Sequence, residues 1–329
     1  MRVSCAHKGP AHTEIEELFD NYEWLADNLV LIRCTEEYLI DILSFAGSIR
    51  FVFEIDQYLP TSNLEDILHY AREMKISHLE GTRMRVKVFK IGKVDTEWKS
   101  ENVERAIGSS IYHRLENPVI DLKHPKEIIA IIVWSGGSAI GRFIREIKAK
   151  SINIRAPKNL PNSKGGAMKQ TIAKLMVNAY RIDRGEYVLD PFCGHGGLLY
   201  EMVEAGYTPI GIELDSRIIR QGVENMVYLK YRSLIHLIHG DALSLPLRRS
   251  AANYVVTDPP YALQTTTSGR SVEKIISDWL NSFSYPVVIS MSTPNETLKE
   301  LPGKWKTLKQ STDYVHRGLT RRLRLITNG

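Results

Sequence analysis

The sequence predicts an α/β protein with two parts: a C-terminal half built on a mostly parallel sheet and a smaller N-terminal α/β region. Beyond residue 166, strand-length apolar runs alternate with helix-length amphipathic segments, which is the pattern of repeated βα units with helices on both faces of a sheet. Residues 305–327 have the turn and the alternation of a hairpin, so we expect the sheet to end in an antiparallel strand. A basic segment with several prolines and glycines, 148–165, indicates a linker between the two parts.

The composition is that of a globular protein without a membrane segment. A chain of 329 residues, with 43% hydrophobic and 25% charged side chains, has room for two or three domains. It lacks the apolar run of roughly 18 residues that a membrane helix needs, and its N-terminus lacks the apolar centre of a signal peptide. We therefore expect a cytoplasmic protein with no membrane partner.

The cysteine pattern argues against disulfides and metal sites. The three cysteines are scattered and odd in number, so we expect neither a disulfide partner nor a Cys-x-x-Cys metal site. Cys5, His7 and His12 could be drawn as a metal cluster, but no fourth ligand follows at a suitable spacing. We expect no metal, and a surface position for this N-terminal segment.

The N-terminal part predicts two small α/β units, 1–54 and 55–147. Apolar patterns predict strands and helical spacing predicts helices; the strands are expected at 24–34, 49–55, 82–91 and 127–134, and the helices at 35–46, 64–74 and 100–116. In one of these strands Met84 and Val86 alternate with Arg85 and Lys87, which indicates one buried face and one basic face.

The C-terminal part, 166–329, predicts five parallel strands in succession. They are expected at 187–190, 208–214, 234–241, 253–258 and 286–292, with helices from Leu198 and at 216–231 and 271–283. In open sheets of this kind, ligands bind beyond the C-terminal ends of the strands. Polar and glycine residues follow each of the first four strands, so we expect the site at that edge.

The first of these strand ends predicts an adenosine-cofactor loop. Gly194, Gly196 and Gly197 lie between a strand and a helix, where positive φ angles and free helix N–H groups let a ligand approach the backbone. A dinucleotide fingerprint would need a third glycine at Leu199, which disfavours NAD. At the next strand end, the Glu213 carboxylate could accept both hydroxyls of a ribose.

Two further strand ends carry acids. Asp241 could accept a hydrogen bond from the amino group of adenine, although a single strand-end Asp is as often a helix cap. The fourth strand ends in Asp258, Pro259, Pro260 and Tyr261. Proline has no N–H group, so this corner is rich in acceptors; the Asp258 carboxylate and the Pro259 carbonyl could hold the two hydrogens of a base amino group while the Tyr261 ring stacks on the base. The sequence therefore predicts a corner that binds an aromatic amine.

These motifs resemble a known family. "DPFCGHGG", "GIELD", "GDALSLP" and "TDPPY", in this order, are similar to the amino-group subset of S-adenosylmethionine-dependent Rossmann-like methyltransferases. "RVKVFKIGK" and "IIVWSGGSAIGRF" resemble a THUMP domain, a tRNA-binding module, behind a small ferredoxin-like domain. The whole chain is similar to the archaeal tRNA (guanine(10)-N2)-dimethyltransferase family.

The resemblance implies roles for named residues. It implies S-adenosyl-L-methionine as cofactor and tRNA as partner, with the target guanine held by Asp258, Pro259, Pro260 and Tyr261. The cofactor site it implies is lined by Met168, Asp190, Pro191, Phe192, Gly194, Gly196, Glu213, Asp241 and Ala242. His195 departs from the small hydroxyl residue common in relatives, and we assign it no role.

The charge distribution favours a polyanionic partner. The segment from Arg142 to Lys174 contains many basic residues and a single acidic one, Glu146. Such a run can also be a solvated helix face followed by a linker. The candidate RNA contacts are Arg85, Lys87, Lys90, Arg142 and Arg145. For the arginines of the last hairpin, two interpretations stay open, contact with RNA phosphate or protection of a sheet edge from aggregation: Arg317, Arg321, Arg322 and Arg324.

The leading hypothesis is a tRNA methyltransferase that acts on the exocyclic N2 of a guanosine, expected at position 10. The alternatives are an amino-methyltransferase acting on DNA or rRNA, a tRNA guanine-N2 methyltransferase of another position, and an RNA-binding protein with a degenerate methyltransferase domain. The sequence leaves open whether one or two methyl groups are added. It also leaves open whether a small helper subunit binds; without one, we expect a monomer.

Overall fold

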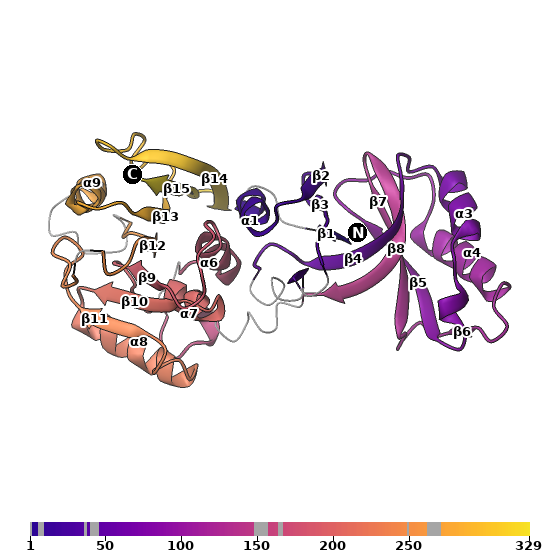
Figure 1. The fold of residues 1–329 in the computed structure, drawn as a ribbon, viewed down its shortest axis with the longest axis horizontal. Helices are drawn as coiled ribbons and strands as arrows, with labels where there is room; N and C mark the ends of the chain where they lie inside the picture. The colour runs from indigo at the N-terminus through magenta and orange to yellow at the C-terminus, as the bar shows by residue number, and fades with distance from the viewer. Residues whose placement is uncertain are drawn as a thin grey trace. The chain divides into compact units, whose positions relative to one another are not determined.

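The computed structural model describes residues 2–5, 10–35, 38–39, 46–147, 157–163, 167–248, 250–261 and 271–329. The chain forms two compact units (Figure 1). The N-terminal unit comprises 1–8, 19–43 and 49–148, and the C-terminal unit comprises 9–18, 44–48 and 149–329. Two short N-terminal segments thus belong to the C-terminal unit.

The N-terminal unit is built on one eight-stranded sheet of order β2-β3-β1-β4-β8-β7-β5-β6. The strands are β1 (Arg2–Cys5), β2 (Tyr22–Ala26), β3 (Leu29–Ile32), β4 (Phe51–Leu59), β5 (Arg83–Lys90), β6 (Val119–Ile120), β7 (Glu127–Trp134) and β8 (Gly137–Glu146). Strand β5 pairs in parallel with β7 and β6, and the other pairs are antiparallel. The sequence predicts one strand at 24–34, whereas the structure has two strands at 22–32, β2 and β3, paired as a hairpin.

Two helices cover one face of this sheet. They are α3 (Leu64–Glu73) and α4 (Ser100–Tyr112), and a short 3₁₀ helix, η1 (Ser77–Leu79), follows α3. Asn63 caps α3 by accepting a hydrogen bond from the Glu65 amide. Ile67 and Ile107 are buried against the apolar face of β5, including Val86, as its alternation predicted. Figure 1 shows α3 and α4 on the same side of the sheet.

Aromatic side chains form a second core on the opposite face. The rings of Phe53 and Phe89 lie 4.9 Å apart edge to face, and Phe89 stacks on Phe143 at 5.4 Å. These residues come from β4, β5 and β8. The segments 1–54 and 55–147 therefore contribute to one sheet, and the predicted boundary falls inside β4, which pairs along its length with β8. The division into a ferredoxin-like and a THUMP domain stays a prediction.

The C-terminal unit contains a seven-stranded sheet of order β11-β10-β9-β12-β13-β15-β14. Its strands are β9 (Tyr187–Asp190), β10 (Thr208–Glu213), β11 (His236–His239), β12 (Tyr254–Thr257), β13 (Val288–Pro294), β14 (Lys306–His316) and β15 (Leu319–Thr327). The first five are parallel, β15 is antiparallel to β13, and β14 is antiparallel to β15. This confirms the mostly parallel sheet with a terminal antiparallel hairpin.

Helices cover both faces of this sheet (Figure 1). Val188 and Val256 pack in the cluster that contains residues of α6 (Gln170–Val177), α7 (Gly197–Glu204) and α8 (Ser216–Tyr228). Their neighbours Leu189 and Val255 pack in the cluster of α9 (Val272–Ser282) on the other face. Because strand side chains alternate between faces, strands buried on both sides are apolar throughout, as the sequence shows.

One helix from the start of the chain packs on this C-terminal unit. The carboxylate of Glu14, in α1 (Pro10–Leu18), is fully buried and accepts hydrogen bonds from the amides of Gly47 (2.8 Å) and Ser48 (2.7 Å) and from Nδ2 of Asn178 (2.6 Å). Lys309 on β14 pairs with two further glutamates of α1. These contacts fix α1 on this unit. The expected surface position of the segment with Cys5, His7 and His12 stays a prediction, since of these three only His12 has a described side chain, and it is partly exposed.

The predicted linker is partly structured. Its described residues, 157–163, begin with a 3₁₀ helix, η2 (Pro157–Asn159). The Asn162 amide donates to Oδ1 of Asn225 on α8 (2.9 Å), and Nδ2 of Asn225 donates back to the Asn162 carbonyl (2.8 Å). Most of the predicted helix at 35–46 lies outside the described residues. Within the described ranges, no helix is long and apolar enough to cross a membrane.

Candidate functional site

A glycine loop with two left-handed backbone positions follows β9. Gly194 and Gly196 have φ angles of 53° and 91°, in the left-handed region that favours glycine. A Cβ at Gly196 would lie 2.8 Å from the Tyr200 hydroxyl, which donates to the His195 carbonyl. A Cβ at Gly194 would meet no atom within 4 Å. The loop is therefore packed against Tyr200 at Gly196 and open at Gly194, where a ligand can approach the backbone.

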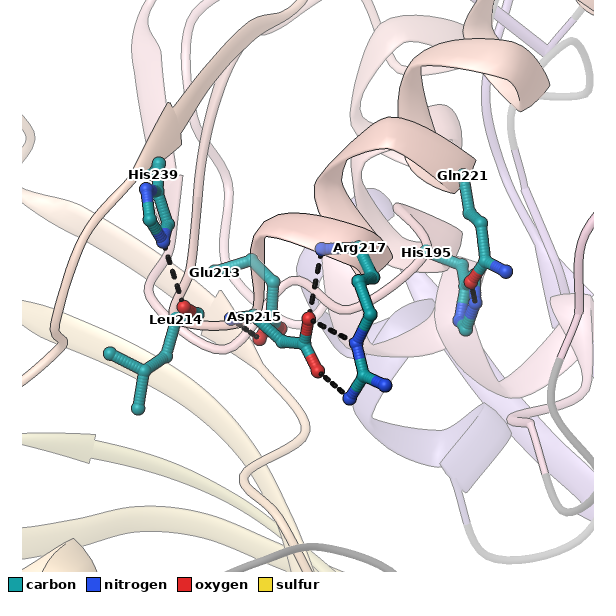
Figure 2. A network of polar contacts seen from close by, with 7 residues as sticks. All are labelled: His195, Glu213, Leu214, Asp215, Arg217, Gln221 and His239. Atoms are coloured by element: carbon teal, nitrogen blue, oxygen red, sulfur yellow. Dashed lines mark hydrogen bonds and ion pairs between the residues drawn. The ribbon is translucent and has the colours of Figure 1, made fainter.

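Glu213, at the end of β10, ties this loop to the next strand end. Its Oε2 accepts from the Gly194 amide (3.1 Å). Its Oε1 accepts from the Asp215 amide (2.9 Å), as Figure 2 shows. Each carboxylate oxygen has two lone pairs, so both retain acceptor capacity for a ligand hydroxyl. The predicted ribose-binding residue is thus held in place by backbone N–H groups.

The neighbouring polar contacts in Figure 2 are structural. Asp215 caps α8 by accepting from the Arg217 amide (2.8 Å), and hydrogen bonds from Arg217 lower the pKa of Asp215 to about 2. His195 Nε2 lies 2.9 Å from Oε1 of Gln221 on α8. His195 is thus tied to a helix surface.

Asp190, at the end of β9, is 1% exposed. Its Oδ1 accepts from the Thr257 hydroxyl (2.7 Å) and from the Phe192 amide (3.2 Å), and the first bond joins the ends of β9 and β12. Burial, together with the nearby carboxylates of Asp258 and Glu213, raises the pKa of Asp190 to about 7, against the lowering effect of these hydrogen bonds. A cationic ligand at this position would favour the ionised form.

The raised pKa of Asp190 predicts a pH-dependent effect of Asp190→Asn on stability. Because the folded pKa lies above the unfolded value, the folded state gains from the protonated carboxyl below about pH 4 and loses that gain as the pH rises through about 7. Asparagine keeps the acceptor for Thr257 but has no charge to bury. The free energy of unfolding of the variant should therefore rise relative to that of wild type as the pH rises, by on the order of a few kcal/mol above pH 7.

Urea unfolding of both proteins without cofactor, between about pH 5 and about pH 8, measures this gain. Asp278→Asn, on the exposed face of α9, is the control and should show no comparable trend. A difference between Asp190→Asn and wild type that does not change with pH would contradict the assignment.

The other predicted cofactor residues lie around the same strand ends. Asp241 is exposed and its Oδ1 accepts from the Leu243 amide (2.9 Å), while Ala242 is buried. The Phe192 ring packs edge to face on Trp279 at 5.5 Å, so it contributes to the core. Met168 is partly buried beside α6.

The corner after β12 is tied together by side-chain contacts. The Tyr261 hydroxyl donates to Oδ1 of Asp258 (2.7 Å) and lies 2.9 Å from Oγ of Ser292 on β13. Loss of hydration raises the pKa of Asp258, while Arg321 and hydrogen bonds from Tyr261 and Ser292 lower it. Pro259 is buried and Pro260 partly exposed. The rest of the predicted loop, 262–270, lies outside the described residues.

Sequence reasoning missed three supporting residues: Thr257, Ser292 and Arg321. Arg321 is only 2% exposed, and its Nε donates to the Tyr261 hydroxyl (3.2 Å). Neither an RNA contact nor an edge charge fits this burial. The arginines in 319–327 were themselves a signal. This strand, β15, lies between β13 and β14, and a buried arginine in an interior strand needs polar partners.

The predicted RNA-binding residues lie on two strands of the N-terminal unit. Arg85, Lys87 and Lys90 belong to β5, and Lys87 and Arg145 are exposed. Nη2 of Arg142 on β8 lies 2.6 Å from the Glu54 carboxylate, so this charge is already paired within the protein.

The sheet order, the fixed glycine loop and the acidic strand ends fit a cofactor that combines adenosine with positive charge. Glu213 has acceptor capacity for ribose hydroxyls, and Asp190 lies where a cation would be favoured. Of the residues that the structure describes, no group of three or more His, Cys, Asp or Glu could hold a metal ion. The fold and site define a Rossmann-like, S-adenosylmethionine-dependent methyltransferase.

Comparison with known proteins places the chain within this class. Residues 157–322 match the family described as "RMKL-like, methyltransferase domain", and the chain belongs to it. More narrowly, it belongs with the archaeal tRNA (guanine(10)-N2)-dimethyltransferases. The Methanothermobacter thermautotrophicus protein of that name is 27% identical over 285 residues, which cover 84% of this chain and 83% of the relative.

Two further comparisons agree. A Methanothermococcus thermolithotrophicus protein named "Probable tRNA (guanine(10)-N2)-dimethyltransferase" is 32% identical over 162 residues, which cover 46% of this chain and 93% of the relative. The crystal structure of TrmN from Thermus thermophilus superposes with a TM-score of 0.63 at 18% identity, covering 99% of this chain and 98% of that one. The last similarity shows the fold.

Proposed function

We propose that this protein transfers a methyl group to the exocyclic N2 of a guanosine in tRNA. One observation carries the proposal: the hydrogen bond from Thr257 to Asp190 (2.7 Å) joins the end of β12 to the end of β9. The Asp258 corner directly follows Thr257, and the glycine loop directly follows Asp190. An acceptor for a base amino group and the cofactor loop are thus built on neighbouring strand ends.

The chemistry required of the protein is mainly positioning. S-adenosylmethionine, when bound, supplies the electrophilic methyl group. The N2 of guanine is a poor nucleophile because its lone pair is shared with the ring. If the Asp258 carboxylate and the Pro259 carbonyl each accept one N2 hydrogen, the lone pair is aimed away from the protein acceptors, and the nitrogen's surplus proton after transfer can pass to the carboxylate. The Tyr261 ring holds the base by stacking.

The cofactor contacts we propose follow the geometry of the loop. Glu213 would accept the ribose hydroxyls and Asp241 the adenine amino group. The backbone around Gly194 and Gly196 would approach the amino-acid part, with Asp190 beneath it. Met168, Pro191, Phe192 and Ala242 would complete the apolar wall, Phe192 indirectly through its packing on Trp279.

Methyl transfer to defined acceptors tests this proposal. Protein and labelled S-adenosylmethionine are incubated with unmodified tRNA, with rRNA or with DNA. We expect label in tRNA alone. Label in DNA or rRNA alone would contradict the choice of substrate, and no label in any acceptor would contradict the activity.

We propose that the N-terminal unit binds the tRNA through β5 and β8. Such contacts neutralise phosphates, so the logarithm of the binding constant should fall with log salt by about 0.7 to 0.9 per phosphate. Lys87→Ala and Arg145→Ala should each reduce this slope by about 1. Arg142→Gln should change it less, because Glu54 already pairs with Arg142.

Fluorescence anisotropy with labelled tRNA over a series of potassium chloride concentrations measures the slope. Lys274→Ala, which removes a paired lysine from α9, serves as the control. A slope near zero for wild type, or equal slopes for all variants, would contradict this binding face.

Position 10 and dimethylation come from the names of the relatives, and for this chain both belong to the proposal. We propose a cytoplasmic enzyme that acts as a monomer unless a small helper subunit binds. Light scattering of the purified protein, with activity measured on the same sample, tests the monomer: an active peak at twice the chain mass would contradict it.

A further inference from the structure

A buried arginine lies behind the acceptor corner. Arg321 on β15 is 2% exposed. Its Nε donates to the Tyr261 hydroxyl (3.2 Å), its guanidinium carbon lies 5.9 Å from the centre of the Tyr261 ring, and its Nη1 lies 3.7 Å from the carboxylate of Asp313 on β14. Strand β15 thus contributes a cation to a corner whose residues come from the end of β12.

The direction of these hydrogen bonds follows from the donors available. A phenol has a single proton, and that of Tyr261 goes to Asp258. The hydroxyl oxygen must therefore accept the bond from Arg321 Nε, while the single proton of the Ser292 hydroxyl can go to Tyr261 or to Asp258. The chain of donors runs from Arg321 through Tyr261 to Asp258, so the position of the carboxylate depends on the arginine.

We infer that Arg321 is a positioning residue for methyl transfer: it fixes the Tyr261 ring and, through the Tyr261 hydroxyl, the Asp258 carboxylate that accepts the target amine. This inference rests on the proposed function. For Arg321 it replaces the two interpretations left open in the sequence analysis, since both require an exposed guanidinium. Arg322, the next residue, instead binds Oδ1 of Asn295 through Nε (3.2 Å) and Nη2 (3.1 Å).

The charge of Arg321 also acts on Asp258. The groups around this carboxylate are Arg321 from β15, Tyr261 from its own loop, Ser292 from β13 and Asp190 from β9; Asp313 from β14 faces Arg321. Loss of hydration raises the pKa of Asp258, and among the groups that lower this pKa Arg321 has the largest effect. Without the cation, Asp258 should stay protonated to a higher pH and lose its role as acceptor there.

Four variants separate positioning from a general structural role: Arg321→Met, Arg321→Lys, Tyr261→Phe and the control Arg322→Gln. Arg321→Met should lower kcat by about 10- to 100-fold with little change in KM for tRNA, and should move the acidic limb of the pH–rate profile to higher pH. Arg321→Lys keeps the charge, so its acidic limb should stay near that of wild type. Arg322→Gln should behave as wild type.

A double-mutant cycle tests the route through Tyr261. If Arg321 acts through the Tyr261 hydroxyl, the substitution Arg321→Met should lower kcat by a smaller factor in the Tyr261→Phe protein than in the wild-type protein. Fully multiplicative losses, equal losses in Arg321→Met and Arg322→Gln, or an unshifted acidic limb would each overturn the inference.

A measurement without turnover keeps this inference distinct from the proposed function. The Asp258 carboxyl can be titrated by NMR with carbon-13-labelled aspartate and assigned with Asp258→Asn. We expect a higher midpoint in Arg321→Met than in wild type or Arg322→Gln, and equal midpoints would overturn the inference. Wild-type protein that transfers no methyl group would instead contradict the proposed function.

Discussion

Replacing Asp258 with alanine is expected to lower the rate of methyl transfer by about 10²- to 10⁴-fold while tRNA binding stays unchanged. The carboxylate is the charged acceptor of the corner, and Tyr261 and Ser292 are arranged around it. Asp258→Asn keeps one carbonyl acceptor and should lose less. Single-turnover rates with saturating tRNA measure both losses.

The free energy of unfolding shows whether a loss of activity in the Asp258 variants comes from a loss of stability. The pKa of Asp258 is raised, so its ionised form costs more in the folded state than in the unfolded state above the folded pKa. Asp258→Asn removes that cost, and its free energy of unfolding at neutral pH should therefore equal or exceed that of wild type. Asp278→Asn, in an exposed ion pair with Lys274, should keep full activity. An Asp258→Ala protein that methylates at the wild-type rate would contradict the assignment of the corner.

Replacing Glu14 with alanine is expected to destabilise the protein by about 2 to 4 kcal/mol. The carboxylate is fully buried and accepts from Gly47, Ser48 and Asn178, and removing it leaves two buried donors and one partly buried donor, that of Gly47, without this acceptor. Glu14→Gln keeps one acceptor oxygen and should cost less. The loss should appear in the unfolding of the C-terminal unit, since all these residues belong to it.

Urea unfolding followed by tryptophan fluorescence measures this loss, and Glu16→Ala is the matched control. Glu16 lies on the same helix but pairs with Lys309 at a partly exposed position, where ion pairs contribute about 0 to 1 kcal/mol. Equal effects of the two substitutions would contradict the assigned role of Glu14. The match to the methyltransferase family begins at residue 157 and so does not include α1.

The sequence predicted the C-terminal sheet and its strand-end residues because their signals are local. Strand and helix periods alternate there, and the glycine loop and the Asp-Pro-Pro-Tyr corner each lie within a few consecutive residues. The Thr257–Asp190 bond could not be predicted, since it joins residues of different strands through side chains. The same holds for Arg321, whose partners Tyr261 and Asp313 are brought together only by sheet order.

The N-terminal part was harder to predict for the same reason. The apolar run around Leu29 indicates a strand, but its pairing as a hairpin with β2 depends on the turn between them. No local pattern marks Glu14 for burial, since its partners lie near residues 47 and 178. The charge of Arg142 suggested RNA, whereas Glu54, on the neighbouring strand, pairs with it.

Nucleoside mapping tests the central claim most directly. Unmodified tRNA treated with this protein and S-adenosylmethionine is digested, and the products are analysed by mass spectrometry of nucleosides and of sequence-assigned oligonucleotides. We predict N2-methylguanosine and N2,N2-dimethylguanosine at position 10, both formed far more slowly when Asp258→Ala protein is used. Methylation on any other atom of guanine, or on another base, would contradict the account.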